Sequence, residues 1–386
     1  MLSIIDKMSI NVVVTFKHFI IKNLNFPSDV ESGFQKTLRQ RVNEYFKQNN
    51  LSRYGESRMI YKSIFMLLLF FGPLLTINTG LIQNVYSLFL LYLISGFGMA
   101  GIGMGIMHDA LHGSYSKNKR LNKIMGLSIN LIGASASIWK IQHNVLHHTY
   151  TNVEEADDDI KVPAILRFSP HSKHYWFHKF QHYYVWPFYC LMTIIWTTVK
   201  DFIKISRYKK MGFFKSTKEA QYEVFKTIIW KILFFSYTLI IPLLVFSGSA
   251  WLVILAHICM HFITGLCLSI IFQVAHVMPT SKFPIPDKNG ILADSWSIHQ
   301  LNTTTNFSPK NKWFSWLIGG LNYQIEHHLL PNISHVHYRN ISPIVEETAK
   351  EYGLPYHIKK DFITAVSDHA RMLRTLGNWQ LSSTMS

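Results

Sequence analysis

The sequence predicts an all-α integral membrane protein, with four transmembrane helices in two hairpins and a helical cap on the cytosolic side of the bilayer. Three observations lead to this fold class. Apolar residues make up 48% of the 386 residues, and many of them are gathered into four long runs. The linkers inside each pair of runs are short and uncharged, and the segments that flank the pairs are strongly basic.

The four apolar runs are residues 62–81, 85–107, 227–246 and 251–275. Each is close to the ~20 residues that an α-helix needs to cross the hydrocarbon core of a bilayer. The linker of the first pair ends just before Val85, and the linker of the second pair is residues 247–250. Because neither linker contains a charged side chain, each pair is expected to form a tight helical hairpin.

Basic residues set the expected orientation, because loops rich in lysine and arginine stay in the cytosol. Residues 36–62, 117–123 and 200–218 are rich in both and flank the hairpins on one side. We therefore expect a multi-pass protein with both termini and its functional site in the cytosol. The expected organisation is an amphipathic cytosolic segment (1–60), a membrane domain (61–340) and a cytosolic tail (341–386).

Three other stretches complete the outline. Residues 31–53 carry an apolar stripe at helical spacing, which predicts a helix on the cap or on the membrane surface. Residues 124–138 are apolar but short, and they predict a re-entrant or interfacial segment. Residues 175–198 are rich in tryptophan and tyrosine, so they predict a surface-lying helix pair rather than a fifth span. The glycines of residues 96–105 predict close helix packing.

Histidines form three short motifs. The candidate ligands in them are His108 and His112, then His143, His147 and His148, then Gln324, His327 and His328. Side chains three or four positions apart lie on one face of a helix, so each motif can direct two of them at one point. One such pair would be unremarkable, but three motifs with seven of the twenty histidines predict a metal centre.

The number of candidate ligands predicts two metal ions. A structural zinc ion takes four ligands and a catalytic one takes three plus water, fewer than these motifs offer. Adjacent histidines such as His147 and His148 point roughly a hundred degrees apart on a helix, so they can serve neighbouring ions. His276 adds an eighth imidazole, because it lies at the cytosolic end of the fourth run. Imidazole-rich sites suit iron, copper, zinc or nickel.

Five carboxylates near the motifs are candidates for orienting the histidine rings, as partners of the ring nitrogen that faces away from a metal. They are Asp109, Asp157, Asp158, Asp159 and Glu326. The helix of the third motif is expected to start after Pro309 and to end at Pro331. His257 and His261 lie too far along the fourth run to join the site, so we assign them to hydrogen bonding between helices.

Composition limits the partners. The formal net charge of +16 favours an anionic membrane surface and acidic soluble partners. The basic residues flank apolar runs without any nucleic-acid-binding motif, so no nucleic acid is expected. The three cysteines have no CxxC spacing and suit a reducing compartment.

The three motifs, with two hairpins between them, resemble those of the membrane fatty acid desaturases, and the resemblance runs over residues 36–356. The glutamine that opens the third motif is similar to that of the front-end acyl desaturases, as is the segment 296–307. The resemblance implies a non-haem centre of two iron ions. Such a centre uses dioxygen and two electrons to place a cis double bond in the acyl chain of an acyl-CoA or a phospholipid.

By position, the resemblance implies eight iron ligands and no catalytic residue beyond them: His108, His112, His143, His147, His148, His276, His327 and His328. Gln324 stands where many relatives have histidine, so it can bind iron directly, bind through water, or only hydrogen-bond. Many front-end relatives also carry a fused cytochrome b5 domain with a His-Pro-Gly-Gly haem motif. This chain has no His-Pro dipeptide, so we expect a separate electron donor such as cytochrome b5 or ferredoxin.

Three alternatives remain open from the sequence. Membrane di-iron hydroxylases use similar histidine motifs on lipid substrates. A histidine-rich metal transporter would need ligands midway across the membrane, where Lys231, His257 and His261 are the notable polar residues. A haem-binding cytochrome would need paired histidines that face each other within the bundle.

Overall fold

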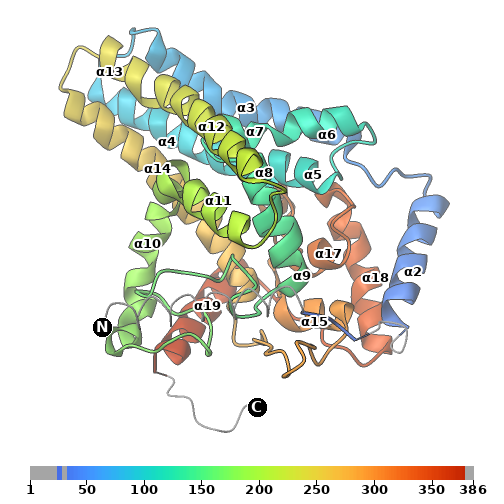
Figure 1. The fold of residues 1–386 in the computed structure, drawn as a ribbon. Coiled ribbons are helices and arrows are strands. Elements are labelled where there is room, and N and C mark those ends of the chain that lie inside the picture. The colour runs from blue at the N-terminus through green and yellow to red at the C-terminus, as the bar shows by residue number, and fades with distance from the viewer. Residues whose placement is uncertain (1–23, 28–32, 379–386) are drawn as a thin grey trace, which may run out of the picture.

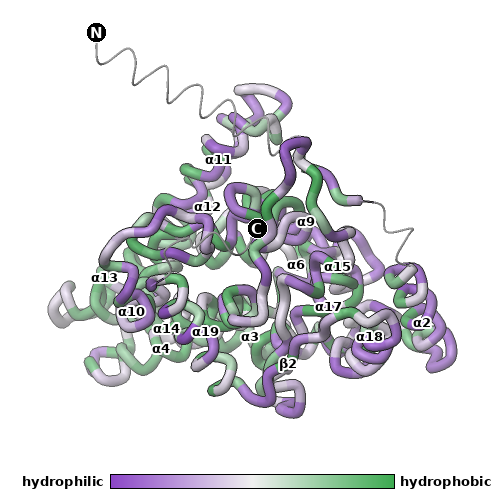
Figure 2. The backbone as a smooth tube through the Cα atoms, turned by 90° about the horizontal axis from the view of Figure 1, so that it is seen from below, coloured by the Kyte–Doolittle hydropathy of each residue, from purple (hydrophilic) through white to green (hydrophobic). Residues whose placement is uncertain are grey.

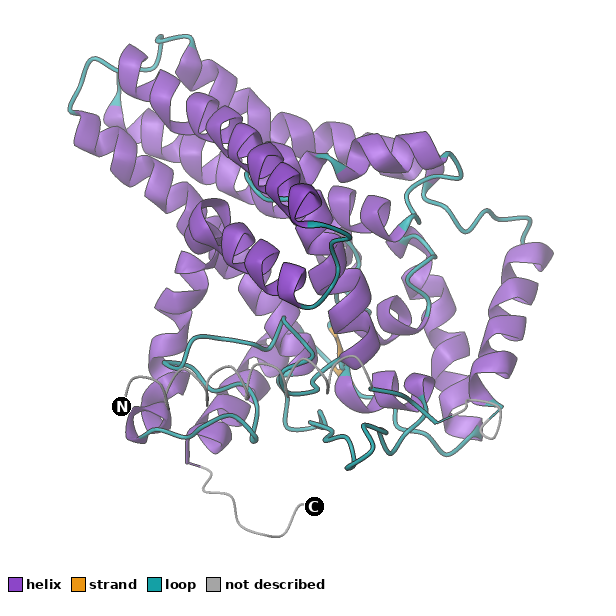
Figure 3. Ribbon diagram, in the orientation of Figure 1, coloured by secondary structure: helices purple, strands orange, loops and turns teal. Residues whose placement is uncertain are grey.

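The computed structural model describes residues 24–27 and 33–378, and its regular secondary structure within them is almost all helix, joined by loops (Figure 3). A two-stranded parallel sheet, β1 (Asn306–Phe307) with β2 (Ile358–Lys359), is the exception. Four helices of the described residues are long and apolar enough to cross a membrane: Glu56–Asn78, Val85–His112, Thr217–Val245 and Ala250–His276. The predicted fold class is confirmed.

The spans form a slanted bundle, and the helices of the C-terminal third of the chain lie below one end of it (Figure 1). The first span is α3 (Glu56–Asn78). The second joins α4 (Val85–Gly101), the π-helix η1 (Ile102–Ile106) and α5 (Met107–His112). The third joins α12 (Thr217–Phe235), η5 (Ser236–Ile240) and α13 (Ile241–Val245), and the fourth is α14 (Ala250–His276). The third span begins ten residues before the expected 227, because Ser216 caps a polar first turn that the apolar pattern does not reveal.

Glycines bring the spans together, as expected from residues 96–105. A Cβ at Gly98 would collide with the backbone of Phe70 in α3, and a Cβ at Gly96 would lie 2.7 Å from the carbonyl oxygen of Met260 in α14. The second span therefore approaches both neighbours at backbone distance, which fixes the position of its C-terminal end and of the first histidine motif, His108 and His112 (box one).

The stretch after the first hairpin is a bent pair of helical segments, Lys119–Leu131 and Ala136–Tyr150, which meet at 107°. They consist of α6 (Lys119–Gly126), α7 (Ser128–Leu131), α8 (Ala136–Trp139), η2 (Lys140–His147) and α9 (His148–Tyr150). Gly133 adopts a positive φ of 86° at the bend. Lys231 of the third span donates to the Gly133 carbonyl (2.9 Å) and pairs with Asp201 (2.8 Å), so a buried ion pair stabilises the bend. This shape agrees with the re-entrant segment that the sequence predicts.

Residues 175–210 form η3 (Trp176–Phe180), α10 (Gln181–Ile195), η4 (Trp196–Lys200) and α11 (Asp201–Lys210), which are not among the four candidate spans. Helix α10 packs along α14, where the missing side chain of Gly265 lets the carbonyls of Tyr189 and Cys190 approach.

The cap consists of α15 (Trp296–Thr303), α16 (Lys312–Leu317), α17 (Gln324–Leu329), η6 (His335–His337), α18 (Tyr338–Glu351), α2 (Phe34–Gln48) and α19 (Phe362–Asn378). The predicted apolar stripe of α2 is buried against α18, and Arg41 pairs with Glu351 at 2.7 Å. Seen from the cap side, α2 and α18 carry largely hydrophilic residues (Figure 2). The predicted helix over 31–53 is therefore present in its described part, and its apolar face packs on the cap.

The expectation of one helix from after Pro309 to Pro331 is wrong. The segment forms two short helices, α16 and α17, because Gly319 and Gly320 between them adopt positive φ angles of 69° and 66°. A Cβ at Gly319 would also collide with the carbonyl oxygen of Met104. The break lets the loop pack against the second span. This packing brings the third motif, Gln324, His327 and His328 (box three), beside box one.

We predict that Gly98→Ala destabilises the bundle by about 1–3 kcal/mol, because the new methyl group forces the backbones of α3 and α4 apart. Gly72→Ala is the matched control, since that glycine lies within α3 and has open space around its Cβ position. Thermal unfolding in detergent measures both. Equal melting temperatures for Gly98→Ala and Gly72→Ala would contradict the close packing.

Candidate metal centre

Box one ends the second span at the membrane surface. His108 and His112 lie on α5, directly after the π-helix η1, and Gly113 with a φ of 76° terminates the helix. His108 is almost fully buried, with 1% of its surface exposed. The second span therefore places the imidazoles of His108 and His112 where the bundle meets the cap.

The second motif, His143, His147 and His148 (box two), lies mainly on a π-helix rather than an α-helix. η2 (Lys140–His147) carries His143 and His147, and His148 begins α9. The wider π turn, with its i to i+5 hydrogen bonds, brings residues four and five apart onto one face. His143 and His148 consequently have their Nε2 atoms 3.3 Å apart. Trp139 stacks on the His143 ring at 4.4 Å between centroids and fixes its plane.

The eight predicted histidines meet in one buried cluster. Their ring nitrogens form overlapping groups with every atom of a group within 4.8 Å of the others. One group joins His108, His112, His143 and His327, a second joins His147, His276 and His328, and a third joins His148, His327 and His328. The Nε2 atoms of His148 and His327 are 2.9 Å apart. These groups share His327 and His328, so the cluster is compatible with a metal site.

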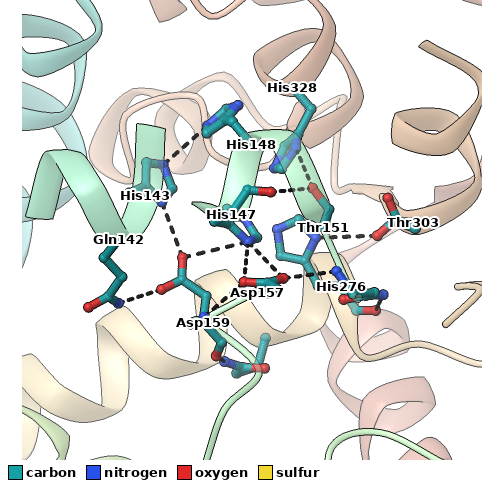
Figure 4. Close-up of polar contacts among 12 residues, drawn as sticks. Gln142, His143, His147, His148, Thr151, Asp157, Asp159, His276, Thr303 and His328 are labelled. Atoms are coloured by element: carbon teal, nitrogen blue, oxygen red, sulfur yellow. Dashed lines mark hydrogen bonds and ion pairs between the residues drawn. The ribbon is translucent and has the colours of Figure 1, made fainter. Parts of the chain in front are cut away.

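Five of the eight rings have their outer nitrogen, Nδ1, held by a polar partner, and Figure 4 shows the contacts of His143, His147 and His276. His143 faces Asp159 at 3.2 Å, and His147 faces Asp157 at 3.0 Å. The other three contacts join His276 to the carbonyl of Thr303 (3.3 Å), His328 to Gln300 (2.8 Å) and His327 to the Tyr338 hydroxyl (3.2 Å). Such partners fix the tautomer and the ring direction of a metal-binding histidine.

The inner nitrogens are suited to a cation. The Nε2 atoms of His112, His147 and His328 are buried with no hydrogen-bond partner among the described residues. Burial keeps the pKa of His327 and of His328 well below the usual range, so both rings are neutral, as a metal ligand must be. Burial also lowers the pKa of His147, but Asp157 and Asp159 outweigh it and raise that pKa to about 9. A cation at His147 therefore displaces a proton.

Comparison with known proteins identifies the family. Residues 84–360 match the family model of the fatty acid desaturases. The chain belongs to the fatty acid desaturase family. It is 36% identical to the acyl-lipid (8-3)-desaturase of Physcomitrium patens, over 92% of this chain and 74% of that protein. It is 32% identical to the sn-1 linoleoyl-lipid 6-desaturase of Arthrospira platensis, over 89% and 92%.

A third relative, the probable Delta(5) fatty acid desaturase C of Dictyostelium discoideum, is 30% identical over 93% of this chain and 79% of its own length. These relatives are of the front-end type that the third motif predicts. The chain is thus an oxidoreductase of the membrane desaturases, and its resemblance to them is confirmed.

The candidate carboxylates of the desaturase divide into two kinds. Asp157 and Asp159 contact histidine rings, as expected. Asp158 instead lies against α11, where it pairs with Lys204 (2.7 Å) and accepts from the Tyr208 hydroxyl (2.6 Å). Its side chain ties box two to α11 without contacting a histidine ring in the described structure.

The carboxylates within the motifs also face away from the cluster. Asp109 lies 2.9 Å from Nδ1 of His335 and accepts from Ser334 (2.7 Å), while its closest approach to the His108 ring is 4.0 Å. Glu326 accepts from Asn306 (2.8 Å) and from Tyr356 (2.7 Å). These two anchor boxes one and three to the cap rather than orient the nearest histidine.

Gln324 is buried at the start of α17, and its side-chain nitrogen has no hydrogen-bond partner among the described residues. Three ring partners, Gln300, Thr303 and Tyr338, were not singled out from the sequence as site residues. Gln300 and Thr303 lie in the segment 296–307 that carries the resemblance to front-end desaturases, which is the signal that points to them. Tyr338 follows the third motif by ten residues and has no local signal.

Four of the described histidines outside the cluster have structural partners. His261 is buried within α14, and its Nδ1 lies 3.3 Å from the Thr193 hydroxyl of α10, consistent with hydrogen bonding between helices. His171, His174 and His178 contact the backbone carbonyls of Phe283, Gly377 and Ala164. These contacts fasten the loop before α10.

A cavity of about 350 Å³ adjoins the histidine cluster of the desaturase. Its wall is mainly apolar and comes from α10, α14 and the loop 162–168, and His143, Gln142 and Asp159 lie at one part of it. Lys161 and Lys200 also border it. The volume is within the usual range of ligand pockets, and the lining is mainly apolar with a few polar groups.

Proposed function

We propose that this desaturase places a cis double bond near the carboxyl end of an acyl chain, at a di-iron centre. The eight proposed ligands are His108, His112, His143, His147, His148, His276, His327 and His328. The observation that carries the proposal is the convergence of their ring nitrogens beside an apolar cavity. An apolar chain in that cavity would lie against His143, with water largely excluded from its methylenes.

Iron is proposed because desaturation is an oxidation. Removal of two hydrogens from adjacent methylenes is balanced when one dioxygen, two electrons and two protons yield two water molecules with the alkene. Zinc has no redox chemistry, whereas imidazole ligands suit iron. Bound iron would supply the activation of dioxygen. Gln324, buried at the start of α17, is proposed to support the neighbouring ligands and not to bind iron directly.

The protein's own residues would orient the centre and the chain. Asp157 and Asp159 hold Nδ1 of His147 and His143, so that the Nε2 atoms face inward. The apolar wall of α10 and α14 fixes the chain, so that hydrogen is removed from one positioned pair of adjacent carbons. Lys161 and Lys200 at the cavity suit the anionic head of an acyl-CoA or a phospholipid.

The iron assignment predicts a metal-content change. Purified protein should hold about two iron ions per chain, as in other paired-metal sites, and His147→Ala should lower that number and abolish turnover. His182→Ala, at a half-buried histidine outside the cluster, should keep the iron. Elemental analysis with an absorption spectrum free of a haem band measures both. Zinc as the sole metal of active protein would rule out the di-iron proposal.

The electrons are proposed to come from a separate acidic carrier, such as cytochrome b5 or ferredoxin, that docks on the basic cytosolic face. We predict that protein in lipid nanodiscs with NADH alone gives no product, and that adding the carrier and its reductase starts both oxygen consumption and product formation. Because protein charge guides this docking, the rate should fall as salt rises. Turnover with NADH alone would contradict a separate donor.

The cavity proposal predicts that Met192→Trp blocks the acyl chain. Met192 lies on the apolar wall, and an indole there would fill part of a space of about 350 Å³. We expect at least a tenfold loss of turnover with unchanged iron content, since hydrophobic pockets discriminate single methylenes by roughly 10-fold or more. Tyr183→Trp is the control, because Tyr183 lies on the exposed face of the same helix. Wild-type turnover in Met192→Trp would exclude this cavity as the acyl site.

A further inference from the structure

Tyr189 of α10 is a polar side chain in the apolar wall of the cavity. It is 4% exposed and lies among Phe168, Leu268 and Met192, which line the same space. Its ring centroid is 6.2 Å from that of Phe168, in an edge-to-face arrangement. A buried tyrosine hydroxyl needs a hydrogen-bond partner, and the partner here comes from the C-terminal helix α19.

The hydroxyl of Tyr189 lies 2.7 Å from Nε2 of His369. The other ring nitrogen of His369, Nδ1, lies 2.8 Å from the backbone carbonyl oxygen of Val277. A carbonyl oxygen only accepts, so Nδ1 carries the hydrogen and Nε2 of the neutral ring is an acceptor. Burial lowers the pKa of His369 to about 4, which keeps the ring neutral. Tyr189 therefore donates to His369 and turns its hydroxyl hydrogen away from the cavity.

The backbone of Tyr189 is held as closely as its hydroxyl. A Cβ at Gly265 of α14 would lie 2.6 Å from the Tyr189 carbonyl oxygen, so the two helices touch there. The Ser269 hydroxyl, one turn further along α14, lies 3.4 Å from the same oxygen. Helix α14 contacts the backbone of Tyr189 and α19 contacts its hydroxyl, and together these contacts fix the position of the ring.

Helix α19 is itself fastened to the cavity wall. Gln181 donates to the Leu373 carbonyl (2.7 Å), and His174 contacts the Gly377 carbonyl (2.7 Å). Arg167, fully buried beside Phe168, donates to the Leu376 carbonyl. Part of the segment expected as a cytosolic tail thus forms a brace against α10 and the loop before it.

We propose that Tyr189 is a specificity-determining residue, and that His369 is the positioning residue that fixes its ring as a rigid wall of the acyl cavity. The wall sets which chain lengths fit and which carbons lie against the histidine cluster. This inference rests on the proposed binding of the acyl chain in the cavity. A fixed aromatic wall can discriminate one methylene by roughly 10-fold to 200-fold, whereas a mobile side chain would yield.

The test compares product ratios in whole cells that express full-length variants. The host receives a series of saturated and unsaturated fatty acids that differ in chain length, and mass spectrometry of derivatised lipids locates each new double bond. Tyr189→Leu removes the wall, His369→Leu removes its brace, and His369→Gln retains one donor and one acceptor. Tyr183→Leu, on the exposed face of α10, is the matched control. A ratio of products is independent of how much protein folds.

We expect Tyr189→Leu to change the ratio of longer to shorter products, or of two double-bond positions, by about tenfold. His369→Leu should shift it in the same direction by less, while His369→Gln and Tyr183→Leu keep the wild-type ratio. Should Tyr189→Leu give no product, the comparison of His369→Leu with His369→Gln decides in its place. Wild-type ratios in both leucine variants would overturn the proposal.

The cavity variant Met192→Trp separates this inference from the proposed function. Blocked turnover in Met192→Trp together with wild-type ratios in the Tyr189 and His369 variants overturns only the inference. Wild-type turnover in Met192→Trp overturns the acyl cavity itself, and the role of Tyr189 with it.

Discussion

The structure depends on one electrostatic constraint, which is that eight imidazoles must be gathered at the membrane surface with their lone pairs directed inward. Buried imidazoles that face one another repel when protonated, and burial further favours the neutral form. A neutral ring has one donor and one acceptor nitrogen, so the outer nitrogen requires a fixed polar partner. Separate segments supply these partners: Asp157 and Asp159 come from the loop after box two, and Gln300, Thr303 and Tyr338 come from α15 and α18 of the cap.

The same constraint explains why Asp158 and Asp109, the carboxylates next to the histidine cluster, have partners outside it. Removing one partner of a buried ion pair typically costs 3–5 kcal/mol, because it leaves a buried charge without compensation. Asp158 is paired with Lys204, and Asp109 lies against His335. These pairs hold boxes one and two to different parts of the scaffold. They also keep two carboxylates from competing with the imidazoles for a cation.

Periodicity and motif spacing were sufficient to predict the spans, the three boxes and the addition of His276, because each is a local pattern or a consequence of hairpin topology. The π-helix of box two was not predictable, since its extra residue per turn leaves no signature in the histidine spacing. The break at Gly319 and Gly320 depends on packing against Met104, a contact between segments more than two hundred residues apart. The ring partner Tyr338 was missed because no local pattern marks it, although it follows the third motif by only ten residues.

The end of α14 connects the metal cluster to the cavity wall. His276 contributes its ring to the cluster, and the next residue, Val277, offers the carbonyl that fixes the tautomer of His369 and so the hydroxyl of Tyr189. One helix terminus therefore sets both the position of a proposed ligand and the position of the proposed wall. Selection of one carbon–carbon bond in a uniform chain requires a fixed distance between the oxidising centre and a surface that stops the chain. A shared anchor keeps that distance constant when the helices move, because both points move together.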